Sequence, residues 1–167
     1  MNPALSLSDS NTSSTNGVDV KPSLVTNEVE PNLLVGDGIF PKGIIPSRGI
    51  VTWYIGQLLD RHTVKSYKID PINMAGFNIG KGFAINGCNA GYPPDIPFDP
   101  FGFDGCKANA CYPGSKTPQQ NACFEYKKTQ IWNANKQVWE KPPSHPVEGM
   151  WGRFPLRALK GKKPLFC

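Results

Sequence analysis

Four of the five cysteines lie within residues 88–123: Cys88, Cys106, Cys111 and Cys123. Four cysteines can form two disulfide bonds in three different pairings, or they can remain reduced thiols. Six prolines in the same range remove amide donors and fix φ, so we expect neither a helix nor a long strand there. This segment therefore needs support beyond its own backbone, either from disulfide bonds or from burial of its aromatic rings.

The other reactive residues predict neither a metal site nor a catalytic centre. The cysteine spacing lacks the paired C-x2-C pattern that is typical of zinc sites. Two histidines, His62 and His145, lie far apart and without the signature of a cysteine–histidine nucleophile. Asp99 precedes a proline and Asp104 precedes a glycine, which favours turns over paired catalytic acids. We therefore expect a protein that is not an enzyme and that requires no cofactor.

Composition and charge limit the size of the core and the kinds of partner that the chain can bind. The 167 residues are 39% hydrophobic and include 17 glycines and 17 prolines, which predicts a small core. Residues 1–47 carry five acidic and two basic residues, whereas residues 48–167 carry eight acidic and sixteen basic residues. The basic part can meet an acidic protein or a peripheral membrane surface, but nucleic acid is not expected because no nucleic-acid motif accompanies it. We expect neither a signal peptide nor a transmembrane helix, which needs ~20 apolar residues.

We expect three parts along the chain. Residues 1–32, rich in Ser, Thr and Asn and without an apolar period, predict an extended N-terminal arm. Residues 33–140 predict a small, irregular centre. Residues 141–167 alternate Pro, Gly and single apolar residues and carry six basic residues against one acidic residue, which predicts a basic, extended C-terminal tail.

The centre is predicted to be a small α+β unit with a high content of irregular and extended chain. A short amphipathic helix is expected over about 47–62, because apolar residues such as Val51, Ile55 and Leu59 recur at i, i+4 and i+8. Short strands are expected over 63–87, where glycines and prolines interrupt a loose alternation. A β-hairpin is expected over about 126–140, because QIW and QVW flank an Asn-rich turn. A continuous helix over 118–140 is the competing interpretation, and Pro/Gly-rich loops with candidate disulfides complete the unit.

Residues 98–103 carry the sequence FDPFGF. This hexapeptide resembles the FDPLGF-type motif that precedes the first membrane helix of chlorophyll-binding light-harvesting proteins. The resemblance covers six residues, no membrane helix follows, and the chlorophyll-ligating helix of that family is absent, so no pigment ligand is carried over. The resemblance implies a thylakoid-associated accessory subunit beside an antenna, and contact with chlorophyll or carotenoid is expected only in that setting.

These observations predict a non-catalytic structural or linker subunit that joins larger protein subunits of an assembly, such as a photosystem–antenna supercomplex. Isolated apolar residues between Pro and Gly suit this role, because each can fill a pocket of a partner. Two alternatives stay open: a minor capsid protein of a virion, and a secreted binding module stapled by disulfides. The candidate partner contacts are aromatic residues: Phe98, Phe101, Phe103, Trp132, Trp139, Trp151 and Phe154.

Overall fold

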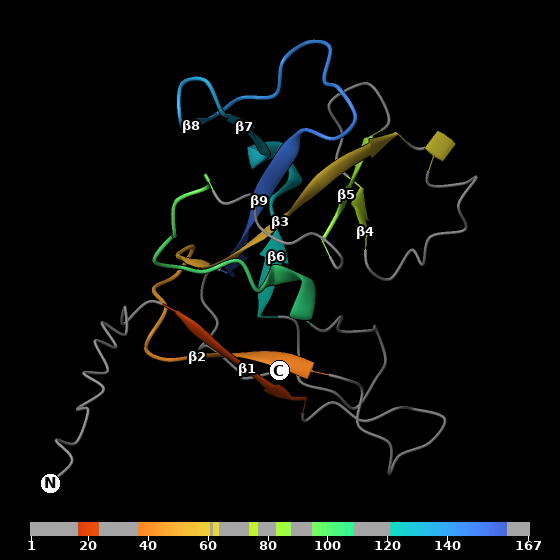
Figure 1. Ribbon diagram of the computed structural model, residues 1–167. Helices are drawn as coiled ribbons and strands as arrows, with labels where there is room; N and C mark the ends of the chain where they lie inside the picture. The colour runs from red at the N-terminus through yellow and green to blue at the C-terminus, as the bar shows by residue number, and fades with distance from the viewer. Residues whose placement is uncertain are drawn as a thin grey trace, which may run out of the picture.

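The chain folds mainly into β-structure (Figure 1). The computed structural model describes residues 17–23, 37–60, 62–63, 74–76, 83–87, 95–108 and 121–159. These ranges contain two short 3-10 helices, η2 (Gly105–Lys107) and η3 (Tyr126–Lys128), a two-residue helical fragment at 62–63, and nine strands. The strands are β1 (Val18–Pro22), β2 (Asp37–Pro41), β3 (Ile50–Asp60), β4 (Met74–Gly76), β5 (Phe83–Asn86), β6 (Ala122–Phe124), β7 (Gln130–Asn133), β8 (Val138–Glu140) and β9 (Trp151–Ala158). The α+β prediction is therefore wrong.

Seven of these strands form one antiparallel sheet. Its order is β4-β5-β3-β9-β7-β8, and β6 pairs with β9 on the same side as β7. The other two strands, β1 and β2, form a separate antiparallel pair, which lies below the large sheet in Figure 1. The 3-10 helix η2 contacts both β3 and β2, so it connects the two sheets.

Strand β3 takes the place of the amphipathic helix that was expected over about 47–62. Its sequence IVTWYIGQLLD is buried from Val51 to Leu58 except at Gln57, so both of its faces are covered. A continuous apolar run satisfies helical spacing and a two-sided buried strand equally well. Here the β-branched and aromatic side chains, which fit a pleated surface, favour the strand.

A proline stands in the middle of β9, between its two neighbouring strands. Pro155 is fully buried and lies opposite Trp53 of β3. The Trp53 amide points away from β9, because it donates to the Gly102 carbonyl. The Pro155 carbonyl accepts from the Glu125 amide, so its nitrogen, which has no hydrogen, faces the break between β6 and β7 that η3 occupies. The strand thus tolerates proline where no ladder bond is required.

Both of the predicted extensions contribute strands to the fold. Strand β1 falls within residues 1–32 and pairs with β2 along its whole length. Strand β9 falls within residues 141–167 and lies between β3 on one side and β6 and β7 on the other. Residues 18–22 and 151–158 of these two ranges are therefore parts of the sheets.

The predicted hairpin is confirmed by the pairing of β7 with β8. Trp132 lies opposite Trp139, and the ring centroids are 5.3 Å apart. The Asn133 side-chain oxygen accepts a hydrogen bond from the Lys136 amide, and Gln137 takes a φ of 56° to close the turn. Strands β4 and β5 likewise lie where short strands were expected, although residues 64–73 and 77–82 lie outside the described residues.

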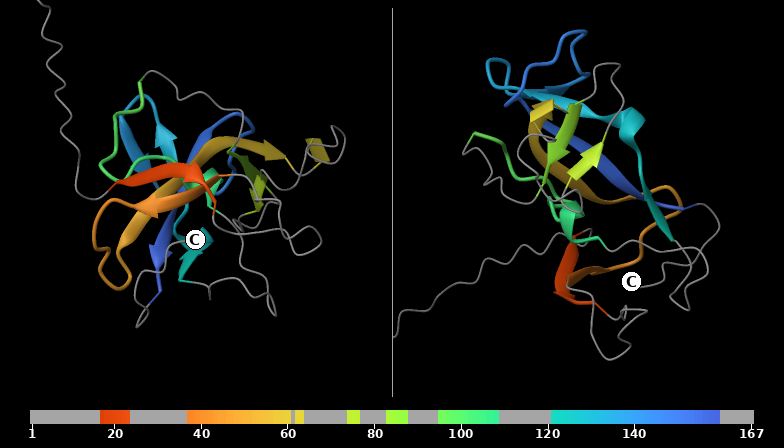
Figure 2. Two further views of the ribbon diagram at one scale, coloured as in Figure 1. Left: turned by 90° about the horizontal axis from the view of Figure 1, so that it is seen from below. Right: turned by 90° about the vertical axis from the view of Figure 1, so that its right-hand side faces the viewer.

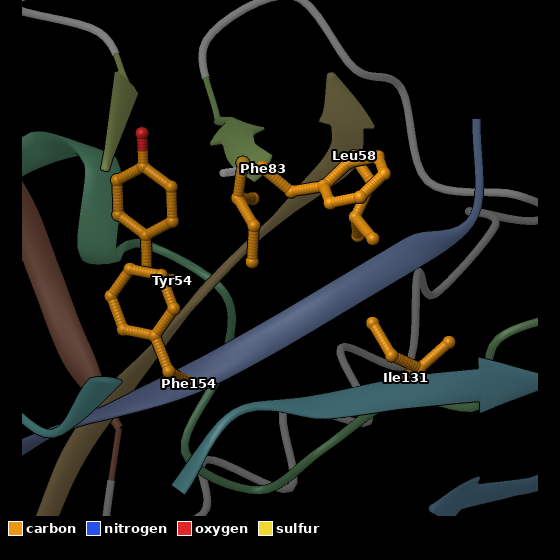
Figure 3. Packing of buried hydrophobic residues seen from close by; sticks show 6 residues of the cluster. Tyr54, Leu58, Phe83, Ile131 and Phe154 are labelled. Carbon is orange, nitrogen blue, oxygen red and sulfur yellow. The ribbon is translucent and has the colours of Figure 1, made fainter. Parts of the chain in front are cut away.

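The main core lies on one face of the large sheet (Figure 3). The rings of Tyr54 and Phe154 stack with centroids 4.9 Å apart, and Phe124 meets both rings edge-on. Leu58 packs in the same cluster and is fully buried. Gly56 allows the closest backbone approach in this region, because a Cβ there would lie 1.9 Å from the Asn86 carbonyl oxygen of β5.

A second cluster joins the two sheets. Val18 of β1 and Ile39 of β2 pack with Val51 of β3 and Leu156 of β9. Strand β3 has one residue more than β9 between Ile50 and Thr52, and this bulge lies beside the cluster. No helix in the described part of the chain is long and apolar enough to cross a membrane.

Candidate functional site: the loop of residues 95–104

The loop of residues 95–104 covers part of the face of the sheet opposite the main core. Ile96 of this loop is buried against Ile55 of β3 and Trp132 of β7, and Phe103 packs against the same cluster. The loop then continues into η2, as the green segment of Figures 1 and 2 shows. It therefore links the tryptophan-rich side of the sheet to the junction between the two sheets.

The C-terminal end of the loop takes the place of a neighbouring strand along part of β3. Strand β5 pairs only with residues 57–60 of β3. Further along, the Gly102 carbonyl accepts from the Trp53 amide and from the Thr52 hydroxyl, each at 3.1 Å. The Asp104 amide donates to the same hydroxyl oxygen at 3.1 Å. The fully buried Thr52 thus fixes the loop to the edge of β3.

Glycine is required at two positions of this attachment. Gly102 has a φ of 68°, a conformation that L side chains rarely adopt. A Cβ at Gly105 would lie 2.8 Å from the backbone of Trp53 and Tyr54. The loop can therefore approach the β3 backbone only because both positions lack a side chain.

A buried cation fixes the middle of the loop. The Arg153 guanidinium lies 3.2 Å from an Asp99 carboxylate oxygen, and its Nε donates to the Gln130 side-chain oxygen at 2.9 Å. The same guanidinium stacks between two indole rings, 3.9 Å from the Trp53 centroid and 4.4 Å from the Trp139 centroid. These cation–π contacts are strengthened by the exclusion of water.

Burial of the Arg153–Asp99 ion pair changes the pKa of Arg153. The side chains of Arg153 and Asp99 are only 11% and 19% exposed. Loss of hydration lowers the pKa of Arg153 to about 10, although the charge and hydrogen bond of Asp99 act in the opposite direction. The guanidinium therefore remains a cation at neutral pH and needs Asp99 as its counter-ion.

Two aspartates complete the conformation of the loop. The second oxygen of Asp99 accepts from the Phe101 amide at 2.9 Å, and the Asp99 carbonyl accepts from the Gly102 amide. At the start of the loop, the Asp95 carboxylate accepts from the Trp132 indole nitrogen at 3.0 Å. The start, the middle and the end of the loop are thus each bonded to the sheet.

The fixed loop exposes Phe98 to solvent. Phe98 is 82% exposed, which makes it the most exposed aromatic residue of those described. Pro97 and Pro100 flank it closely and restrict the backbone on both sides. The loop therefore presents one apolar ring to the outside with little freedom to withdraw it.

The structure divides the predicted contact residues by exposure. Phe98 is exposed, whereas Phe101, Phe103, Trp139 and Trp151 are half-buried, and Trp132 and Phe154 are buried. A partner could touch the Phe154 ring only if the main core opened. The residues that fix the loop were not predicted: Thr52 and Arg153 carry no local signal, and Asp99 was predicted only as a turn residue.

Among the described residues, the contacts that hold this loop do not include a disulfide bond. Cys106 of η2 packs against the main core, and no disulfide joins it to Cys123 of β6, the other candidate cysteine among the described residues. Cys88 and Cys111 lie outside the described residues. Within the ranges that the structure describes, no three His, Cys, Asp or Glu side chains are grouped as metal ligands would be. Hydrogen bonds and the Arg153–Asp99 ion pair provide the attachment instead.

Comparisons with known proteins do not indicate a function for this chain. No protein-family model, curated protein or solved structure matches this chain.

Proposed function

We propose that this chain is a non-catalytic structural subunit that joins larger proteins in an assembly, with Phe98 as its anchor. The observation that supports this proposal is the 82% exposure of Phe98 on a loop that is bonded to the sheet at three places. Aromatic residues that fill a pocket of a partner dominate the energy of many protein interfaces.

The fixed loop makes such an anchor effective. Complete burial of a phenylalanine side chain contributes about 1.5–3 kcal/mol. A flexible segment would lose much of this gain, because ordering its backbone on binding opposes association. The Asp99 turn and the attachment of Gly102 to β3 already order the loop in the free protein.

The hexapeptide 98–103 favours one kind of assembly. Its resemblance to the light-harvesting motif makes a photosystem–antenna supercomplex the first assembly to examine. In that setting the chain is an accessory subunit beside the antenna. The capsid alternative predicts recovery in shelled particles instead, so the composition of the recovered assembly separates the two.

The test compares two exposed apolar residues in the full chain. Phe98→Ala removes the proposed anchor, and Ile44→Ala is the matched control, because Ile44 is 90% exposed but lies in the connection between β2 and β3. Tagged wild type, F98A and I44A are expressed in the cells from which the chain derives and are fractionated by size.

We expect wild type and I44A to elute with a large assembly and F98A to elute alone with an unchanged melting temperature. Elution of wild type as a monomer, or of F98A with the assembly, would refute the proposal.

A further inference from the structure

The loop of residues 95–104 has the opposite charge to the whole chain. Its sequence DIPFDPFGFD contains three aspartates and no basic residue, whereas the chain carries a net charge of +5. Asp95 is exposed, and Asp99 and Asp104 are half-buried. The exposed Phe98 therefore has aspartates on both sides of it in the sequence.

Of these three charges, that of Asp95 stands without a neighbouring cation among the ion pairs of the described residues. Asp99 is paired with Arg153, so the two side chains together are neutral. Asp95 accepts from a neutral indole group and belongs to no ion pair of the described residues, whereas the positive charge of Lys42 acts on Asp104. The loop thus presents the apolar ring of Phe98 together with one exposed, unpaired carboxylate, that of Asp95, three residues before it.

We propose that Phe98 binds an apolar pocket of a protein partner whose rim is formed by lysine and arginine residues. This inference rests on the proposed function and adds the chemistry of the partner to it. Complementary charges at the rim of an interface steer association and exclude wrong partners. An acidic protein surface or the anionic face of a membrane would be repelled by the exposed carboxylate of Asp95.

The first experiment identifies the surface that Phe98 touches. The full chain carries p-benzoylphenylalanine at position 98, or at position 147 as a control, because Val147 is also exposed. The chain is irradiated in the cells from which it derives, and the crosslinked peptides are sequenced. We expect crosslinks from position 98 to a protein segment with apolar residues flanked by lysine or arginine, and none to that segment from position 147.

The second experiment measures how the affinity for the purified partner, identified by the crosslink, depends on the charge of the loop. Asp95→Asn removes one charge but keeps an oxygen that can accept from the Trp132 indole. Asp19→Asn is the matched control, because Asp19 is exposed in β1, outside the loop. We expect D95N to weaken binding about two- to fivefold and to reduce its salt dependence, whereas D19N binds like wild type.

The outcomes separate this inference from the proposed function. A crosslink to a protein surface without basic residues, or an unchanged or tighter affinity of D95N, overturns the basic rim while the anchor role of Phe98 stands. Crosslinks to lipid alone, or no crosslink from position 98, overturn both.

Discussion

Arg153 offers the sharpest test of how the loop is held. Arg153→Met keeps an unbranched side chain between the rings of Trp53 and Trp139 but removes the positive charge. It also removes the hydrogen bond to Gln130 and leaves the Asp99 carboxylate, only 19% exposed, without a counter-ion. We therefore expect the loop to lose its central attachment.

The expected cost follows from these contacts. A charge-assisted hydrogen bond contributes about 1.5–3 kcal/mol, and each cation–π contact contributes about 0.5–1 kcal/mol. Relief of the burial that lowers the pKa of Arg153 to about 10 acts in the opposite direction. We expect the free energy of unfolding to fall by about 3 kcal/mol, which lies at the lower end of the range for a broken buried ion pair.

Arg157→Met is the matched control on the same strand. Arg157 pairs with Glu125 at 2.8 Å, but these side chains are 29% and 36% exposed, so we expect a loss of about 1 kcal/mol or less. Urea unfolding followed by tryptophan fluorescence measures both variants, and a double-mutant cycle with Asp99→Asn measures the coupling, expected to be about 2 kcal/mol. The reasoning fails if R153M loses no more stability than R157M, or if the effects of R153M and D99N simply add.

Two further substitutions test the attachment of β5 and the burial of Asp104. Gly56→Ala should destabilise the sheet by about 3 kcal/mol, because its Cβ would lie 1.9 Å from the Asn86 oxygen. Gly149→Ala is the control: no atom lies within 4 Å of the new Cβ, so the substitution should cost about 1 kcal/mol through its positive φ. Similar melting temperatures for the two variants would contradict this expectation. Burial raises the pKa of Asp104, so its contribution to stability is present when it is protonated and is lost as the pH rises through the folded-state pKa. Asp104→Asn should therefore melt above wild type at pH 7 and approach it near pH 3, and a lower melting temperature at pH 7 would refute the assignment.

Local patterns predicted the parts of the fold that depend on local contacts. The β7–β8 hairpin was predictable because its turn and both of its tryptophans lie within a few residues of one another. Strand β3 was not, because IVTWYIGQLLD fits a buried helix or a buried strand. Its β-branched and aromatic residues favour the strand, but the neighbours that complete the sheet, β5 and β9, are distant in sequence.

The candidate site shows the same limit. The aromatic run at 98–103 indicated a contact surface, and Phe98 is exposed as such a surface requires. The role of Arg153 could not be predicted, because the Asp99 that it pairs with lies 54 residues earlier. The cysteines suggested disulfide support, whereas the described contacts of the loop are the hydrogen bonds of Thr52, the Asp95–Trp132 hydrogen bond and the Arg153–Asp99 ion pair.

The position of β9 in the sheet has a consequence for how the chain is made. Tyr54 of β3 lies opposite Phe154 of β9, about 100 residues later. At a synthesis rate of ~5–20 residues per second, β9 is synthesised roughly 5–20 s after the apolar β3. During that time its exposed edge can pair with other nascent chains. Folding should therefore be slow for a chain of this size, and its yield in the cell should depend on chaperones that shield β3 until β9 emerges.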